Sequence, residues 1–406
     1  MSPAGQSEGP LSGRRILVAV TGGIAAYKAA ALARLLRERG ADVQVIMTST
    51  ATRFVGPATF EALTGRPVHS DLFERSESVL HVRLAHEADA VVVAPATADV
   101  MAKLATGLAD DLVSAVLLEA TCPLVLAPAM HSGMWANGAT QRNVVSLTER
   151  GATMVGPVEG PLAAGDEGMG RMAEPEEIAE AVARVLGPRD LDGARVIVTA
   201  GPTHEPVDAV RFLGNRSSGT MGVEVARAAA VRGAAVTLVL GPGEAAPPSG
   251  VEVVRVETAE DMRAVVDGAF ETADAVVMAA AVADFRPVRE APGKIKKDAG
   301  IPVLDLEPTP DILAGLGKRK GGQILVGFAA ETGDVESEGR RKLVEKNLDL
   351  VVANVVGSPG TGFGSRTNRA AILARGGDDV PMREWTKREL ADAVCDRLAA
   401  LLASRS

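Results

Sequence analysis

The sequence predicts an α/β protein built from two doubly wound, Rossmann-like domains with parallel sheets. A strand, a glycine turn, a helix and a second strand follow one another in residues 14–48, and the same order recurs in residues 194–241. DAVVVAPATAD at 89–99 and DAVVMAAAVAD at 274–284 extend the repeat, since each reads as a buried strand running into small residues. Alternating strands and helices favour parallel sheets covered by helices on both faces. We therefore expect ligands outside the carboxyl ends of the strands.

A polar break with Gly187 and Pro188 separates the two halves. Glycine and proline directly after a helix are typical of a linker. We expect a disordered lead-in at 1–13, a first domain at 14–187, a linker at 188–193 and a second domain at 194–406. The first dozen residues have neither a basic start nor an apolar core, so they do not resemble a signal peptide.

The composition indicates a soluble protein that acts on small molecules. The 406 residues carry a net charge of −9 with a pI near 5.3, which argues against a nucleic-acid binder. The longest apolar run, residues 112–130, is interrupted by Glu119, Pro123 and Pro128, which argues against a membrane span. Cys122 and Cys395 stand far apart, so neither a disulfide framework nor a thiolate zinc site is indicated, and a cytoplasmic location fits best.

Two strand-to-helix loops in the first half are candidates for holding a phosphate. TGGIAAYK at 21–28 places two glycines before a helix, and PATAD at 95–99 adds a hydroxyl before another. Helix N-termini present free N–H groups and partial positive charge, and small residues allow close approach. Neither loop matches GxGxxG or the Walker pattern, so a plain turn remains the alternative.

The histidines give two candidates for acid–base or hydrogen-bonding roles. His81 lies in a helix-like segment that leads into the strand ending at PATAD, and His131 follows a buried strand. Packing in a helix is the alternative for His81. His86 reads as helix surface, and His69 has no companions. No metal-ligand spacing connects these residues, which favours proton transfer over ligation.

In the second half, Lys294, Lys296 and Lys297 form a basic cluster flanked by glycine and proline. A solvated surface is the simple interpretation. The alternative is that these lysines neutralise a triphosphate while glycine and serine amides hold its oxygens. The polar residues that favour this second interpretation are Asn215, Ser217, Ser218 and Asp284.

Several motifs in one order resemble two known enzyme families. GGIAAYK, His81, PATAD, AKLATGLADDL, PAMHxxMW and GDEGMGRM resemble the flavin-dependent cysteine decarboxylases. NRSSGTMG, AAAVADF, KIKK, TPDIL, VGFAAET and KNLDLVVAN resemble the phosphopantothenate–cysteine ligases. The two fused in this order resemble the bifunctional coenzyme A biosynthesis family over residues 14–403.

For the first domain the resemblance implies FMN and decarboxylation of 4′-phosphopantothenoylcysteine to 4′-phosphopantetheine. In the family the flavin oxidises the cysteinyl thiol to a thioaldehyde, CO2 is lost, and the reduced flavin returns the electrons. His81 matches the active-site histidine, and Met130 and His131 match substrate-binding positions. The implied FMN contacts are Gly22, Gly23, Ile24, Ala25, Thr48, Phe54, Pro95, Ala96, Thr97 and Ala98.

For the second domain the resemblance implies CTP-dependent ligation of L-cysteine to 4′-phosphopantothenate through an acyl-cytidylate. Asn215 would stabilise that intermediate, Lys294 would assist its conversion to the amide, and Arg211 would meet the substrate phosphate. Mg2+ is expected with CTP, although no carboxylate cluster identifies its ligands. The implied nucleotide contacts are Asp284, Lys294, Thr309, Pro310, Asp311, Ile312, Phe328, Lys342 and Lys346.

Two positions of the first domain depart from the family pattern. The family has asparagine at His131 and a proton-donating cysteine at Ala164. Alanine cannot donate a proton, whereas an imidazole can replace an amide contact. Three outcomes follow: water or His131 supplies the proton, an oxidised product accumulates, or the domain only binds flavin. We favour the first.

The glycine-rich segment 160–172 reads as a mobile flap over the site, anchored by Arg171 and Met172. The family forms trimers of the first domain and dimers of the second, which implies a homo-oligomer, a dodecamer. The main alternative is a working ligase joined to a non-decarboxylating oligomerisation module. A nicotinamide oxidoreductase is the other, although GxGxxG is missing from both first turns.

Overall fold

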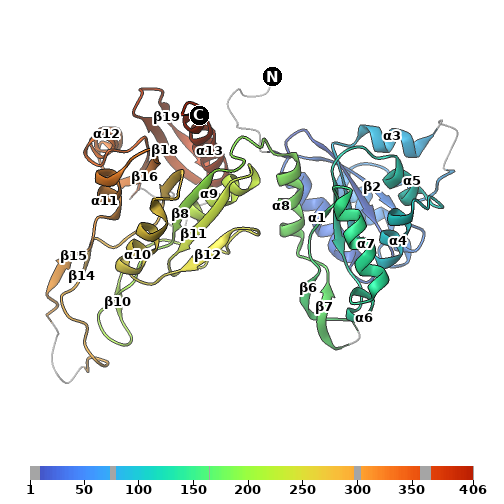
Figure 1. Cartoon of the computed structure of the whole chain (residues 1–406), viewed down its shortest axis with the longest axis horizontal. Coiled ribbons are helices and arrows are strands. Elements are labelled where there is room, and N and C mark those ends of the chain that lie inside the picture. The colour runs from blue at the N-terminus through green and yellow to red at the C-terminus, as the bar shows by residue number, and fades with distance from the viewer. Residues whose placement is uncertain (1–9, 74–78, 164, 297–302, 357–366, 406) are drawn as a thin grey trace. The chain divides into compact units, whose positions relative to one another are not determined.

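The computed structural model describes residues 10–73, 79–163, 165–296, 303–356 and 367–405. The chain forms two compact units, Glu8–Pro188 and Arg189–Ser406. Each unit has a largely parallel sheet with helices on both faces, so the predicted α/β, doubly wound fold class is confirmed (Figure 1). Among the described residues, no helix is both long and apolar enough to cross a bilayer.

The sheet of the first unit is entirely parallel, in the order β2-β1-β3-β4-β5. Ile16 of β1 pairs with Val43 on one side and Ala90 on the other, so the chain reverses direction across the sheet beside β1. That reversal opens a crevice at the carboxyl ends of β1 and β3. The strands are β1 Arg15–Val20, β2 Asp42–Met47, β3 Ala90–Ala96, β4 Leu124–Pro128 and β5 Thr153–Met154.

Local capping explains where the helices of this unit begin. The Thr97 hydroxyl accepts from the Val100 N–H at the start of α4, and Asp111 forms a capping box with Ser114 at the start of α5. Pro175 opens α8. The helices are α1 Ala26–Glu38, α2 Pro57–Thr64, α3 Leu80–Glu87, α4 Ala98–Thr106, α5 Leu112–Glu119, α6 Ser132–Trp135, α7 Gly138–Glu149 and α8 Pro175–Leu186, with a 3₁₀ turn at Ala51–Arg53.

The segment predicted as a flap contains an antiparallel hairpin of β6 Val158–Pro161 and β7 Glu167–Arg171. Its second strand runs against the end of β4, where the Met130 N–H donates to the Gly170 carbonyl over 3.0 Å. A Cβ on Gly170 would lie 2.1 Å from the Met130 carbonyl oxygen. Glycine is therefore required at this crossing, in a backbone conformation with a φ of 154°.

The second unit has an eight-stranded sheet in the order β12-β11-β8-β13-β16-β17-β18-β19. Strand β18 runs antiparallel to β17, and β19 runs antiparallel to β18. The sequence analysis did not predict these two antiparallel pairings. Only residues 375–379 join β18 to β19, and so short a connection permits only antiparallel pairing. The strands are β8 Arg195–Ala200, β11 Ala235–Leu240, β12 Glu252–Arg255, β13 Ala275–Met278, β16 Ile324–Glu331, β17 Leu350–Val355, β18 Thr367–Ala374 and β19 Val380–Thr386.

Alternating apolar residues of this sheet form a core on each face. Val196 and Val198 pack on the face covered by α9, and Ile197 packs on the other. Two small hairpins, β9 with β10 and β14 with β15, lie outside the sheet (Figure 1). The remaining elements are α9 Thr220–Val231, α10 Ala259–Phe270, α11 Ile312–Arg319, α12 Val335–Glu345, α13 Lys387–Ala403, β9 Glu205–Pro206, β10 Phe212–Leu213, β14 Phe285–Pro287 and β15 Leu306–Pro308.

Candidate functional site

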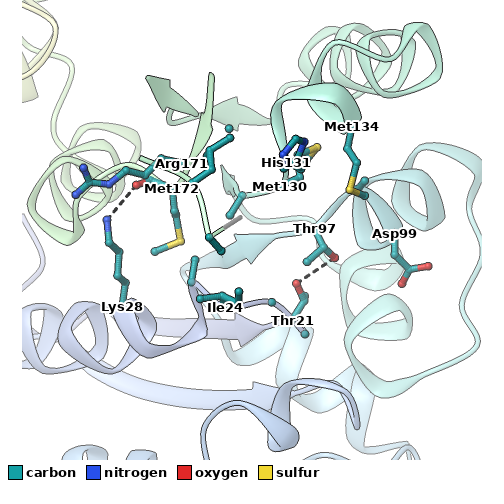
Figure 2. A pocket seen from close by; sticks show the side chains of 18 of the residues that line it. Thr21, Ile24, Lys28, Thr97, Asp99, Met130, His131, Met134, Arg171 and Met172 are labelled. Atoms are coloured by element: carbon teal, nitrogen blue, oxygen red, sulfur yellow. Dashed lines mark hydrogen bonds between the residues drawn. The ribbon is translucent and has the colours of Figure 1, made fainter. Parts of the chain in front are cut away.

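A cavity of about 790 Å³ opens at the carboxyl ends of β1, β3 and β4 (Figure 2). This volume is within the range of cofactor sites in proteins. Its walls come from the loops before α1 and α4, the end of β4 and the flap hairpin. Of the residues expected to contact a cofactor or substrate, those lining it are Gly22, Gly23, Ile24, Ala25, Thr48, Thr97, Ala98, Met130 and His131.

Three expected cofactor residues do not line this cavity. Ala96 is fully buried inside β3, so its side chain packs in the core. The backbone carbonyl of Pro95 accepts from the Thr21 hydroxyl over 2.6 Å, and its ring borders the cavity residue Gly23. Phe54 follows the 3₁₀ turn and is 51% exposed. Contact of these three residues with a cofactor stays a prediction.

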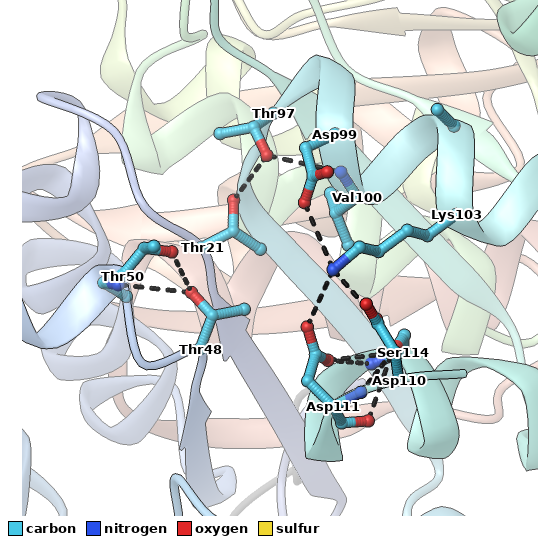
Figure 3. A network of polar contacts seen from close by, with 12 residues as sticks. Thr21, Thr48, Thr50, Thr97, Asp99, Val100, Lys103, Asp110, Asp111 and Ser114 are labelled. Carbon is cyan, nitrogen blue, oxygen red and sulfur yellow. Dashed lines mark hydrogen bonds and ion pairs between the residues drawn. The ribbon is translucent and has the colours of Figure 1, made fainter. Parts of the chain in front are cut away.

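Short polar contacts fix the loops that face the cavity (Figure 3). The Thr21 hydroxyl lies 3.2 Å from that of Thr97, which ties the loop after β1 to the loop after β3. The hydroxyls of Thr48 and Thr50 lie 3.0 Å apart at the end of β2. A Cβ on Gly22 would lie 2.5 Å from the Thr50 Oγ1, so only glycine allows these loops to meet.

Lys103 connects this wall to α5, a role that the sequence analysis missed. Its ammonium lies 2.9 Å from Asp110, 3.2 Å from Asp111 and 3.4 Å from the cavity residue Asp99 (Figure 3). The hydrogen bond to Asp110 raises the pKa of Lys103 and lowers the pKa of Asp110. The pattern Lys-x₆-Asp-Asp in AKLATGLADDL is the sequence feature that could have indicated this ion-pair cluster.

Lys28 is a second cation that sequence reasoning did not single out. It is 8% exposed, lines the cavity, and donates to the Met172 carbonyl over 3.2 Å and to Glu174 over 3.0 Å (Figure 2). Arg171 also donates to Glu174, over 2.6 Å. These contacts join α1 to the chain directly after β7. They support Arg171 and Met172 as the anchor of the flap.

His131 connects the end of β4 with the flap. Its Nδ1 accepts from the Gly133 N–H over 3.4 Å, and its Nε2 lies 3.0 Å from the Asp166 Oδ2. A neutral ring that accepts at Nδ1 carries its proton at Nε2, so Nε2 donates to the carboxylate. Both side chains are about half exposed. Ala164, the other departure from the family pattern, lies outside the described residues.

Within the described chain, His81, His86 and His69 do not line this cavity. His81 is half-buried on α3, as expected for a helix residue, and is not among the residues lining the cavity. His86 lies on the surface, where its Nε2 is 3.0 Å from Glu119. His69 forms a backbone bridge with Ile46. A role for His81 in the chemistry stays a prediction.

The second unit has a smaller cavity, of about 110 Å³, at the carboxyl ends of β8, β13, β16 and β17. The strand order reverses beside β8, which is where ligands bind in such sheets. Phe328 is the expected nucleotide residue that lines it. The other lining residues are Ser217, Ser218, Gly219, Thr220, Met221, Gly222, Ala279, Ala280, Ala281, Ala330, Asn354, Val356, Asn368 and Lys387.

Other expected ligase residues gather around the loop after β13. Asn215 donates to the Val282 carbonyl over 2.8 Å, and Thr309 donates its N–H to the Asp284 carbonyl over 3.1 Å. Their neighbours Pro310 and Ile312 lie in the same segment, since Ile312 opens α11. These residues thus share one end of the sheet with the smaller cavity.

The expected cations of α12 are paired with carboxylates. Lys346 lies 2.7 Å from Asp311, and Lys342 lies 2.5 Å from Glu331. Burial raises the pKa of Asp311, but the hydrogen bonds from Lys346 and the Ala314 N–H outweigh it, so the net pKa is below the usual value. Lys346 caps α12 rather than lying within it.

Asp208 is a buried carboxylate that the sequence analysis missed. Its Oδ2 accepts from the Ile295 N–H over 3.0 Å and from Arg211 over 3.0 Å. The bond from Ile295 is the main reason why the pKa of Asp208 lies below its usual value. Asp208 therefore holds Arg211 beside the segment that carries the exposed Lys294. Lys297 lies outside the described residues.

Among the described residues, no group of three or more histidine, cysteine or acidic side chains is arranged to hold a metal ion.

Comparisons with known proteins place both halves in one family. The family model "Flavoprotein" matches residues 4–187, and the "DNA/pantothenate metabolism flavoprotein C-terminal domain" matches residues 191–402. The coenzyme A biosynthesis bifunctional protein CoaBC of Mycobacterium tuberculosis H37Rv is 47% identical, covering 97% of this chain and 98% of that protein. Its Bacillus subtilis counterpart is 44% identical, covering 96% and 98%.

Among solved structures, the C-terminal domain of a CoaBC protein is 38% identical and covers 53% of this chain and 99% of its own, with a TM-score of 0.46. The resemblance identified from the motifs is confirmed by the full-length relatives. The chain belongs to the CoaBC family of bifunctional coenzyme A biosynthesis enzymes.

Proposed function

We propose that this chain catalyses two consecutive steps, with ligation in residues 194–406 and decarboxylation in residues 14–187. The second domain would join L-cysteine to 4′-phosphopantothenate at the expense of CTP. The first would convert the resulting 4′-phosphopantothenoylcysteine to 4′-phosphopantetheine with FMN. The observation that carries the proposal is the cavity of about 790 Å³ formed by the motif loops in a chain with full-length CoaBC relatives.

The large cavity suits FMN in shape and in chemistry. Helices α1 and α4 both begin at its wall, where free N–H groups favour a phosphate. Ile24 and Tyr27 add apolar surface for a ring system. When bound, the flavin accepts two electrons from the substrate thiol and returns them after CO2 is lost. The residues proposed to hold it are Gly22, Gly23, Ile24, Ala25, Thr48, Thr97 and Ala98.

His131 is the proposed substrate contact and proton donor of the first domain. Its Nε2–H points to Asp166, and this contact orients the ring at the cavity wall. An imidazolium is a suitable acid near neutral pH, and it can also pair with the substrate carboxylate. This assignment lets the reduced product form although position 164 is alanine. His81 is proposed as the group that takes the proton when the thiol is oxidised.

In the second domain, the 4′-phosphopantothenate carboxylate would attack the α-phosphorus of CTP and release pyrophosphate. The cysteine amine would then displace CMP from the acyl-cytidylate. Asn215 is proposed to stabilise that intermediate, Lys294 to assist amide formation, and Arg211 to hold the substrate phosphate. Mg2+ would accompany the triphosphate and offset its charge. The proximity of Arg211 and the Lys294 segment around Asp208 supports this arrangement.

We also propose that the protein is cytoplasmic and forms a homo-oligomer, which by family resemblance is a dodecamer.

The test is a coupled assay of the purified full-length protein. With CTP, L-cysteine and 4′-phosphopantothenate we expect CMP, pyrophosphate and CO2. Supplying 4′-phosphopantothenoylcysteine directly should give CO2 without CTP. Ligation without any CO2 release in either assay would favour the alternative, a ligase joined to an oligomerisation module.

A further inference from the structure

Lys387 lines the smaller cavity of the second unit without a counter-ion. It is the first residue of α13, and its ammonium forms no hydrogen bond or ion pair with any residue in the described part of the chain. Burial lowers its pKa, and the more distant charge of Glu224 only partly opposes this. An ammonium that is half-buried without a partner is costly unless a ligand supplies the negative charge.

The N-terminus of α9 also lines this cavity. Gly219 caps this twelve-residue helix with a left-handed backbone and offers no side-chain cap. Helix α13 packs alongside α9, and Gly219, Thr220 and Lys387 all line the same cavity. The start of α9, with its free N–H groups and partial positive charge, therefore lies beside Lys387.

Asn368 is a second polar side chain of the cavity that lacks a good partner. It is 8% exposed, at the start of β18, and its amide N–H contacts only the Met221 sulfur, over 3.6 Å. A thioether is a weak acceptor. Its carbonyl oxygen has no partner among the described residues. Buried amides normally have partners, so this one is available to a ligand.

We propose that Lys387 and Asn368 bind phosphoryl oxygens of an anionic substrate in this cavity, together with the N-terminus of α9. The inference rests on the proposed ligase function, which offers two sources of such a group: the triphosphate of CTP and the phosphate of 4′-phosphopantothenate. The cavity of about 110 Å³ is several times the roughly 15 Å³ that a single water needs. The antiparallel strands and α13 thus contribute directly to substrate binding.

The test measures equilibrium binding by calorimetry on the full-length protein, with three ligands used one at a time: CTP with Mg2+, 4′-phosphopantothenate, and cytidine. Lys387→Gln should raise the Kd of one phosphorylated ligand by about tenfold or more, because a charged hydrogen bond is lost. The ligand affected identifies the source. The Kd of cytidine should stay within twofold, since it has no phosphate.

Three controls make the result decisive. Arg388→Gln changes the neighbouring charge, which does not line the cavity, and should leave every Kd unchanged. Lys387→Arg should retain most of the affinity, and Asn368→Ala should weaken the same ligand by about threefold or more. Unchanged Kd values for both phosphorylated ligands in Lys387→Gln, or an equal loss for cytidine, would overturn the inference. Ligation by the wild type is measured separately, so failure of the proposed function is distinguished from failure of this assignment.

Discussion

The Nε2 atom of His131 lies 3.0 Å from Oδ2 of Asp166, and this pair joins the end of β4 to the flap hairpin. His131 lines the large cavity, and its Nδ1 is held by the Gly133 N–H. The carboxylate thus orients the ring.

Asp166→Asn should slow decarboxylation of 4′-phosphopantothenoylcysteine. The amide keeps the size of the side chain but is a weaker acceptor for the Nε2–H, so the ring is held less firmly and we expect kcat to fall by about ten- to a hundredfold. The rate of CO2 release measures this. Ligation by the same preparation is the internal control and should be unchanged. A variant with wild-type kcat across the pH range would show that the pair has no part in the chemistry.

Gly22→Ala should reduce flavin binding, because the new Cβ would lie 2.5 Å from the Thr50 Oγ1 and force the loop outward. Gly23→Ala is the matched control, since its Cβ would approach no atom closer than 3.6 Å. The flavin content of the purified proteins, from visible absorbance, compares the two. We expect near-complete flavin loss in Gly22→Ala and near-wild-type content in Gly23→Ala. Equal flavin content in both would contradict the steric argument.

Asp208→Asn should impair ligation without affecting decarboxylation. The variant loses the carboxylate charge, which in the wild type holds both Arg211 and the Ile295 N–H in place. We therefore expect kcat/KM for 4′-phosphopantothenate to fall by at least about tenfold. Formation of CMP measures this. Asp192→Asn removes an exposed partner of Arg189 and serves as control. Unchanged ligation in Asp208→Asn would mean that Arg211 does not need this carboxylate.

The lowered pKa of Asp208 also gives a pH prediction. A carboxylate whose pKa is depressed by folding stabilises the native state above its ordinary unfolded value. That contribution is lost as the pH falls through the folded pKa. The wild type should therefore lose stability below about pH 4 more steeply than Asp208→Asn. Parallel unfolding midpoints of the two proteins across this range would rule out the linkage.

Gly222→Ala should destabilise the second unit, because the added Cβ would meet the Thr199 carbonyl oxygen at 2.6 Å and push α9 off β8. We expect a loss of about 1–3 kcal/mol. Gly268→Ala is the control, since nothing lies within 4 Å and a helical alanine stabilises by about 0.5–1 kcal/mol. Urea unfolding followed by the fluorescence of buried Trp385 measures both. A Gly222→Ala midpoint at or above that of Gly268→Ala would refute the packing argument.

Repeated βαβ patterns predicted the fold class well, because buried parallel strands and amphipathic helices have distinct periods. The same patterns could not predict that β18 and β19 are antiparallel, because the apolar residues of a strand do not indicate its direction. The sequence could predict that the strand-end loops meet at one site, because the carboxyl ends of parallel strands share one edge of a sheet. The contacts expected at Phe54 and Ala96 stay predictions, since neither residue lines the cavity.

Contacts between distant segments were the least predictable part of the site. Asp166 and His131 stand 35 positions apart in sequence, and Lys28 meets Glu174 across 146 positions. No local sequence pattern indicates such pairs, because their geometry depends on how the flap hairpin packs against β4 and α1. Asp208 and Arg211 are spaced by three residues, yet only the folded chain shows that Ile295 shares the same carboxylate.

The most direct test of the central claim, that this chain completes both steps with alanine at position 164, is mass analysis of the product. Wild type and Ala164→Cys are each incubated with 4′-phosphopantothenoylcysteine. We predict CO2 and 4′-phosphopantetheine from both. A wild type that yields only the oxidised, decarboxylated enethiol, while Ala164→Cys yields 4′-phosphopantetheine, would contradict the account.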